Sequence, residues 1–258
     1  MAEARQVSSR DNPLLVRVRK LGADPGAYRK LGEVWLEGDH LCSAFAQRGG
    51  RAVQAIVSTA GWEQPALRAL AGQAAAVAIV PPELMAGLST LESPPAIGFV
   101  VTTPTAPALA PEQASVVLDR LQDAGNVGAI LRSASAFGFT QVLALKGTAA
   151  LWSPKVLRAG MGAHFALRLV EGLESDALAA LQVPMLGTSS HAAQALHEVD
   201  LPWPCGWVLG HEGQGVSAAL QRQCAMALRI PQPGGEESLN VAAAAAVCLY
   251  ESARQRAR

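Results

Sequence analysis

The sequence predicts an α/β protein of two domains, the second built on a mostly parallel sheet with helices on both faces. Between residues 115 and 258, short apolar segments alternate with helical patterns, which is typical of parallel strands joined by helices. Half of the 258 residues are hydrophobic and only 16% are charged, which allows each domain a buried core. A proline-rich stretch, residues 102–114, favours an extended linker. We therefore expect an N-terminal domain at residues 1–101 and a C-terminal domain at residues 115–258.

The N-terminal domain is expected to be a small α/β unit. Its sequence pattern predicts a short helix at residues 41–49 and strands at residues 53–58, 76–80 and 96–101. Two prolines end the second of these strands, because proline cannot donate to a strand ladder.

The C-terminal domain contains a regular succession of predicted strands and helices. The apolar segments expected as strands are residues 115–118, 141–145, 166–170, 184–188, 206–210 and 226–230. One helix is indicated by apolar residues that share a helical face, namely Val127, Ile130, Leu131, Ala134 and Phe137. Another is expected to begin with Ser153 as its cap and Pro154 at its first position.

Composition narrows the classes of protein to which the chain can belong. Lys and Arg together number 21, as do Asp and Glu. The chain therefore has no net positive charge that would by itself indicate binding to nucleic acid. The cysteines lie far apart without a C-x-x-C pair, which favours reduced thiols over zinc ligands or disulfides. The N-terminus has no apolar signal region, and the longest apolar run is ten residues, too short to cross a bilayer. We expect a cytoplasmic protein with no membrane partner and no metal.

Polar loops follow four of the predicted strands. They are DRLQDAGNVGAILR from residue 119, TSSH from 188, GHEGQG from 210 and PQPGGEESLN from 231. Because the carboxyl ends of parallel strands meet at one edge of a sheet, these loops are expected to converge on one pocket. GHEGQG taken alone is more typical of a tight turn than of a binding site, and only its combination with the other loops favours a site. It is not the dinucleotide fingerprint, and no P-loop is present, so the expected ligand is nucleotide-like without phosphates or is held by backbone groups.

Three of these segments carry a family resemblance. Residues 119–139, 208–217 and 230–251 resemble, in order and spacing, the three motifs of the SpoU-type (TrmH-like) RNA 2′-O-ribose methyltransferases of the SPOUT superfamily. Residues 8–21 and 34–45 are similar to that family's small N-terminal substrate-binding domain, which is related to a ribosomal-protein RNA-binding fold. The resemblance implies a deep trefoil knot in the C-terminal domain, S-adenosylmethionine (SAM) as methyl donor, RNA as substrate and a homodimer.

The resemblance also implies roles for particular residues. The implied catalytic residues are Asn126, Arg132, Glu212, Ser238 and Asn240. Those implied to hold the cofactor are Gly187, Thr188, Ser189, Leu209, Gly210, Gly213, Ile230, Ser238 and Leu239. Those implied to bind RNA are Arg10, Asn12, Arg17, Lys20 and Arg132.

Other interpretations of these residues remain open from the sequence. Asn126 and Ser238 could instead be helix N-caps, and Arg132 and Glu212 could be surface charges. If Arg132 is catalytic, it could act as a base or, as we favour, as an anchor, because a guanidinium is rarely deprotonated. Residues 242–246 form an alanine run that is expected to pack against a knot strand or a partner chain.

The sequence departs from the family motifs at two positions. Ala124 stands where the first motif usually has Pro, and His211 stands where the second usually has Asn or a small residue. Neither departure removes a group that methyl transfer needs. We expect ribosomal RNA as substrate ahead of tRNA, with a non-catalytic RNA-binding protein of the same fold as the alternative.

Overall fold

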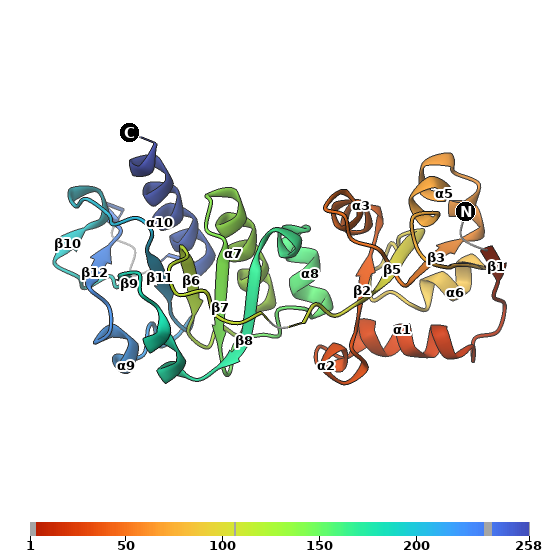
Figure 1. Cartoon of the computed structure of the whole chain (residues 1–258), viewed down its shortest axis with the longest axis horizontal. Coiled ribbons are helices and arrows are strands. Elements are labelled where there is room, and N and C mark those ends of the chain that lie inside the picture. Colours follow the sequence, from red (N-terminus) through yellow and green to blue (C-terminus); the bar gives the residue numbers. More distant parts are fainter. Residues whose placement is uncertain (1–3, 106, 235–238, 258) are drawn as a thin grey trace. The chain divides into compact units, whose positions relative to one another are not determined.

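The computed structural model describes residues 4–105, 107–234 and 239–257 (Figure 1). The chain forms two compact units, one made of Met1–Thr105 with Trp152–Phe165 and the other of Ala106–Leu151 with Ala166–Arg258. Within the described ranges, no helix is both long enough and apolar enough to cross a membrane.

The first unit contains a five-stranded mixed sheet in the order β1-β4-β3-β5-β2. Its strands are β1 (Ala4–Gln6), β2 (Glu33–Glu37), β3 (Gln54–Ser58), β4 (Val77–Val80) and β5 (Ile97–Thr102). Its helices are α1 (Pro13–Ala23), α2 (Ala27–Leu31), α3 (Asp39–Gln47), α4 (Thr59–Trp62), α5 (Pro65–Ala71) and α6 (Pro82–Ala86). The predicted helix and the three predicted strands are present to within two residues at each end, whereas β1, β2 and the remaining helices had not been predicted.

A short segment from the second half of the sequence also belongs to the first unit. Residues 152–165, which include α8 (Pro154–Gly160), lie between two strands of the second unit in sequence. Phe165 packs edge-on against Phe45, with ring centroids 5.2 Å apart. Arg158 donates to the hydroxyl of Thr90 at 3.1 Å and lies 3.6 Å from the carboxylate of Glu37. The sequence had placed this segment with the rest of residues 115–258, because nothing in its local pattern indicates its packing partner.

The second unit contains a seven-stranded sheet in the order β10-β12-β9-β11-β6-β7-β8. Every adjacent pair of strands is parallel, which confirms the predicted mostly parallel sheet. The strands are β6 (Ser115–Leu118), β7 (Gln141–Leu145), β8 (Arg168–Leu173), β9 (Met185–Thr188), β10 (Gln194–Ala195), β11 (Gly206–Leu209) and β12 (Met226–Arg229). β8 begins two residues later than predicted, because a 3₁₀ turn occupies Ala163–Ala166. The two-residue strand β10 had not been predicted.

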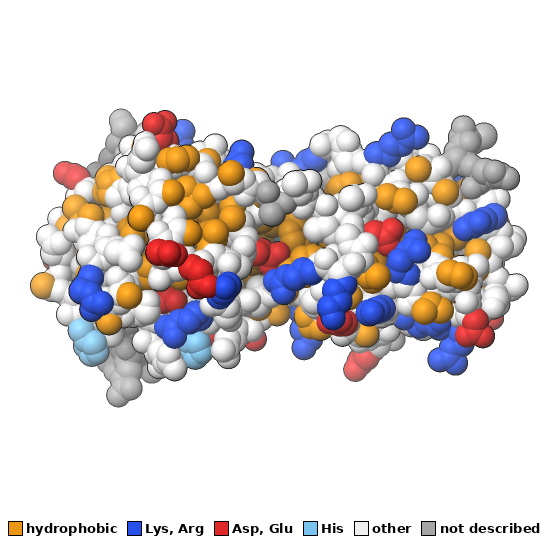
Figure 2. All heavy atoms as spheres, turned by 60° about the horizontal axis from the view of Figure 1, so that its bottom comes forward, with side chains coloured by type: hydrophobic (Ala, Val, Ile, Leu, Met, Phe, Trp, Pro, Cys, Tyr) orange, Lys and Arg blue, Asp and Glu red, His pale blue; other side chains and the backbone are white. Residues whose placement is uncertain are grey.

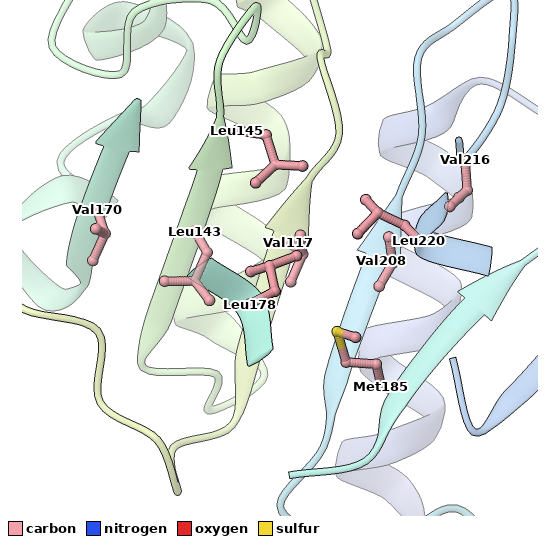
Figure 3. Close-up of a cluster of buried hydrophobic side chains, with 9 residues drawn as sticks. All are labelled: Val117, Leu143, Leu145, Val170, Leu178, Met185, Val208, Val216 and Leu220. Carbon is pink, nitrogen blue, oxygen red and sulfur yellow. The ribbon is translucent and has the colours of Figure 1, made fainter. Parts of the chain in front are cut away.

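Helices cover both faces of this sheet. α7 (Ala124–Ala136) and α10 (Val241–Arg256) lie side by side on one face, where the indole of Trp207 donates to the hydroxyl of Ser252 at 2.9 Å (Figure 1). The other face carries a cluster of buried apolar side chains that includes Leu178 of a 3₁₀ helix and Leu220 of α9 (Ala218–Gln221) (Figure 3). Burial of each such side chain stabilises the folded state by about 1.5–3 kcal/mol. The helices packed on the two faces therefore hold in place the sheet whose loops form the site.

The predicted face of α7 is buried as expected. Val127, Ile130, Leu131 and Ala134 are fully buried, and Phe137 at the end of the helix is half-buried. In α10, Ala245 is fully buried, whereas Ala243 is exposed, so only part of the alanine run contacts the rest of this chain.

Candidate functional site

A pocket of about 640 Å³ lies in the second unit, where the loops after β9, β11 and β12 meet the start of α10. The residues implied by the resemblance that line it are Thr188, Ser189, Gly210, Glu212, Gly213, Ile230, Leu239 and Asn240. Further lining residues are Ser190, His191, His211, Gln214, Gly215, Val216, Gln221, Leu228, Gln232, Val241 and Ala244. Many of these residues are neighbours of predicted residues in the same loops. Extending the predicted site to the whole of each polar loop would therefore have identified them.

The loop after β11 folds tightly because of its glycines. A Cβ atom at Gly210 would lie 2.1 Å from the backbone of Gly215 and Val216, so only glycine fits there. Gly215 has a φ of +67°, in the left-handed region that favours glycine. The Nδ1 atom of His211 accepts a hydrogen bond from the amide of Gly213 at 3.0 Å. His211 therefore supplies an acceptor that an asparagine side chain could also supply, and this departure from the motif leaves the turn intact.

Glu212 connects this loop to the loop after β6. Its carboxylate accepts hydrogen bonds from the backbone amides of Gln122 at 3.3 Å and Asp123 at 3.1 Å, and from Nδ2 of Asn126 at 3.3 Å. Partial burial raises the pKa of Glu212, but a hydrogen bond from its own backbone amide, together with the three just named, outweighs this effect and holds the pKa below the ordinary value of 4.5. Glu212 therefore acts here as an ionised acceptor that ties two loops together.

Two asparagines extend this connection to the start of α10. Nδ2 of Asn240 donates to Oδ1 of Asn126 at 3.0 Å. Oδ1 of Asn240 in turn accepts from the amides of Ala242 at 2.9 Å and Ala243 at 3.2 Å, which makes Asn240 the N-cap of α10. Residues from all three motif-like segments thus form one hydrogen-bonded chain, from Glu212 through Asn126 to Asn240.

The helix caps differ from those considered from the sequence. Asp123 is the N-cap of α7, because its carboxylate accepts from the amide of Asn126 at 2.7 Å. The side chain of Asn126 is consequently free of a capping role and takes part in the hydrogen-bonded chain instead. Ser238 lies outside the described residues.

Of the implied catalytic and cofactor-holding residues that the structure describes, four do not line the pocket: Asn126, Arg132, Gly187 and Leu209. Arg132 is exposed on α7, and no hydrogen bond or ion pair links it to any residue in the described part of the chain. Gly187 and Leu209 are buried within β9 and β11, where they support the loops that follow. A Cβ atom at Gly187 would lie only 3.1 Å from the sulfur of Cys224, so Gly187 permits close packing behind the pocket.

The implied RNA-binding residues of the first unit differ in their surroundings. Arg10 and Lys20 are exposed. Asn12 caps α1 by accepting from the amide of Leu14 at 3.0 Å, and Arg17 forms an ion pair with Glu33 at 2.6 Å. Figure 2 shows further Lys and Arg side chains spread over one face of this unit. Of the implied residues, Arg10 and Lys20 are therefore the best placed to contact a ligand.

Among the residues that the structure describes, no group of three or more His, Cys, Asp and Glu side chains is placed to hold a metal ion. Instead, the pocket combines backbone groups, amide and hydroxyl side chains, and the apolar side chains of Leu228, Ile230 and Leu239. A parallel sheet whose carboxyl-end loops form such a pocket defines an α/β protein that binds a small organic molecule.

Comparison with known proteins identifies the family. Residues 113–250 match the family model described as the SpoU rRNA Methylase family, and the chain belongs to this family. The resemblance found in the sequence is thereby confirmed.

Individual relatives agree with this assignment. The chain is 34% identical to an uncharacterized tRNA/rRNA methyltransferase of Synechocystis sp., over 97% of this chain and 94% of that protein. It is 37% identical to the 23S rRNA (guanosine-2′-O-)-methyltransferase RlmB of Bordetella pertussis, over 55% of this chain and 59% of the relative. The crystal structure of the SpoU methyltransferase AviRb from Streptomyces viridochromogenes in complex with AdoMet has a TM-score of 0.84 and 25% identity, covering 95% of this chain and 99% of that one.

Proposed function

We propose that this protein is a SAM-dependent RNA methyltransferase that methylates a ribose 2′-hydroxyl, with ribosomal RNA favoured over tRNA. The observation that supports the proposal most directly is the hydrogen-bonded chain of Glu212, Asn126 and Asn240. It joins the three motif segments beside a pocket of cofactor size. The relatives named for 2′-O-methylation of rRNA support the choice of the ribose hydroxyl and of rRNA.

The residues of the pocket fit SAM, which supplies an electrophilic methyl group on a sulfonium when it is bound. Leu228, Ile230 and Leu239 provide apolar surface for an adenine ring. Thr188 and Ser189, at the end of β9, provide hydroxyls and backbone groups for polar atoms. The pocket lacks a phosphate-binding glycine fingerprint, in keeping with a nucleoside ligand that carries no phosphate.

The polar residues beside the pocket are proposed to orient the reacting groups. A ribose hydroxyl is a weak nucleophile at neutral pH and loses its proton during attack, so precise placement contributes much of the rate. The side-chain amide of Asn126 is held in one orientation, because its Nδ2 donates to Glu212 and its Oδ1 accepts from Asn240. We assign Arg132 the role of an anchor for an RNA phosphate, because a guanidinium binds phosphate bidentately and is rarely deprotonated.

The first unit is proposed to bind the RNA substrate through its shape and backbone. The exposed Arg10 and Lys20 are the expected contacts. Replacing both with alanine should weaken RNA binding and reduce its salt dependence, whereas Arg51→Ala, at another exposed site of this unit, serves as the matched control. Point variants are preferable to deletion of residues 1–101, because residues 152–165 pack within the same unit.

We further propose a homodimer formed through α7 and α10, and a trefoil knot in the C-terminal segment. On α10, Val247 is 41% and Tyr250 is 53% exposed, and Tyr250 packs edge-on against Phe137, which follows α7, with ring centroids 5.7 Å apart. A second copy would cover this apolar face. The knot is supported by the family resemblance, and an experimental structure that traces residues 230–241 through the loop after β11 would test it. The proposed location is the cytoplasm.

The experiment that tests the proposed function has two parts. Calorimetry should detect SAM binding by the full chain, and incubation with SAM and ribosomal RNA should produce 2′-O-methyl nucleosides that mass spectrometry can detect. SAM binding without methyl transfer to any RNA would favour the alternative of a non-catalytic RNA-binding protein with the same fold.

A further inference from the structure

The turn that follows β6 contains a buried carboxylate that the proposed mechanism does not use. Asp119 is only 2% exposed. Its amide donates to the carbonyl of Leu209 at 2.8 Å, which extends the pairing of β6 and β11 by one residue. One carboxylate oxygen accepts from Nε of Arg120 at 2.9 Å, and the other accepts from the amide of Ser217 at 2.7 Å. Both oxygens are therefore satisfied, one of them by the far end of the pocket loop.

Burial of a carboxylate is costly unless the charge is paired and hydrogen-bonded. Burial raises the pKa of Asp119, but hydrogen bonds from Arg120 and Ser217 act in the opposite direction, and the net pKa lies below the ordinary value of 3.8. The carboxylate therefore remains ionised and holds the amide of Ser217 at neutral pH.

Arg120 connects the same turn to the middle of the pocket loop. Its backbone has a φ of +60°, which is uncommon for a residue with a side chain. In this conformation, the guanidinium of Arg120 donates to Asp119 and also, through Nη1, to Oε1 of Gln214 at 3.3 Å. Gln214 lines the pocket. Arg120 thus joins a buried anion to a residue that would face the ligand.

We infer that Asp119 and Arg120 are positioning residues that hold residues 210–217 in the conformation that binds the methyl donor. This inference rests on the proposed function for the identity of the ligand, but the hold on the loop is a property of the free protein. Glu212 fixes the near half of the loop to Gln122 and Asp123, whereas Asp119 and Arg120 fix Gln214 and Ser217 in the far half. The two sets of contacts together restrain the whole loop.

The first test uses the ligand-free protein. Arg120→Ala should increase hydrogen–deuterium exchange of amides in residues 210–217 by about tenfold, because a charge-assisted contact is lost. Lys146→Ala is the matched control, because Lys146 is an exposed residue that pairs with Glu174 and makes no contact with the pocket loop. Unchanged exchange in the Arg120 variant would overturn the inference whether or not the protein binds SAM.

The second test measures SAM affinity by calorimetry on the full chain. Arg120→Ala and Gln214→Ala should each weaken binding about tenfold, and the double variant should be little weaker than either, because the two residues act through one contact. In the Arg120→Ala variant, single-turnover methylation at saturating SAM should change much less than the affinity. A purely structural role would lower the melting temperature and leave the affinity unchanged, and that outcome, or additive losses in the double variant, would overturn the inference. If the unmodified chain does not bind SAM, that result would instead contradict the proposed function.

Discussion

Replacement of Glu212 with glutamine tests how the loops of the site are held together. The glutamate carboxylate accepts three hydrogen bonds, at 3.1 Å from Asp123 and at 3.3 Å from both Gln122 and Asn126. Glutamine has nearly the same shape but only one acceptor oxygen, and its amide group would oppose the N–H groups that now donate to Glu212. The variant should therefore fold while the loop after β11 loses its fixed position relative to the loop after β6.

The expected magnitude follows from the length and exposure of these bonds. Hydrogen bonds to charged groups contribute roughly 1.5–3 kcal/mol each in favourable settings. Glu212 is exposed and two of its bonds are long, so we expect a total loss of about 1–2 kcal/mol, which is about 5–30-fold in SAM affinity. Calorimetric titration at neutral pH measures this difference, and equal affinities for the two proteins would refute the proposed role of Glu212.

The pH dependence gives an independent check on the same residue. Because the pKa of Glu212 is lowered in the folded protein, its stabilising contribution is complete above its ordinary value of 4.5. It is lost as the pH falls through the lowered pKa. The difference in melting temperature between the two proteins should therefore be constant from pH 7 to about pH 5 and shrink at more acidic pH. A difference that does not shrink would indicate that the carboxylate charge has no role.

Four further outcomes are expected. Arg132→Lys should bind SAM normally but transfer methyl about a hundredfold more slowly in single-turnover assays, because lysine lacks the planar fork of arginine; near-native transfer would eliminate bidentate phosphate binding. Ala245→Leu should overpack a buried contact and cost about 1–3 kcal/mol in thermal unfolding, whereas Ala243→Leu, at an exposed position of the same helix, should not. Tyr250→Asp should yield a monomer in mass measurements if α10 forms the dimer interface. His211→Asn should retain SAM affinity, because asparagine can accept the same hydrogen bond from the amide of the turn.

The sequence predicted the second unit well because its signals are local. Apolar segments of four or five residues between polar loops correspond to β6, β7, β9, β11 and β12 to within one residue at each end. The buried face of α7 likewise follows from spacing alone. The position of the pocket at the carboxyl edge follows from the parallel connections. Of the four loops expected to converge, those after β9, β11 and β12 line the pocket, whereas the loop after β6 does not.

Other features depend on contacts between distant residues and could not be predicted in this way. The segment 152–165 packs in the first unit through Phe45, Glu37 and Thr90, none of which is near it in sequence. Asp119 gave no signal, because its role depends on the amide of Ser217, 98 residues away. The sequence left Ser238 open as a helix cap by residue type, whereas Asn240 caps α10 and also bonds to Asn126. Local preference identified the helix start, and only the folded chain identifies the residue that serves two partners.

The measurement that tests the proposed function most directly is the chemical position of the transferred methyl group. The full chain is incubated with SAM that carries an isotopically labelled methyl group and with ribosomal RNA lacking natural methylation. The RNA is then digested to nucleosides and analysed by mass spectrometry. The proposal predicts label on the ribose of one nucleoside type, as a 2′-O-methyl group, and much slower appearance of that label with the Arg132→Lys variant. Label on a nucleobase, or no label in RNA despite SAM binding, would contradict it.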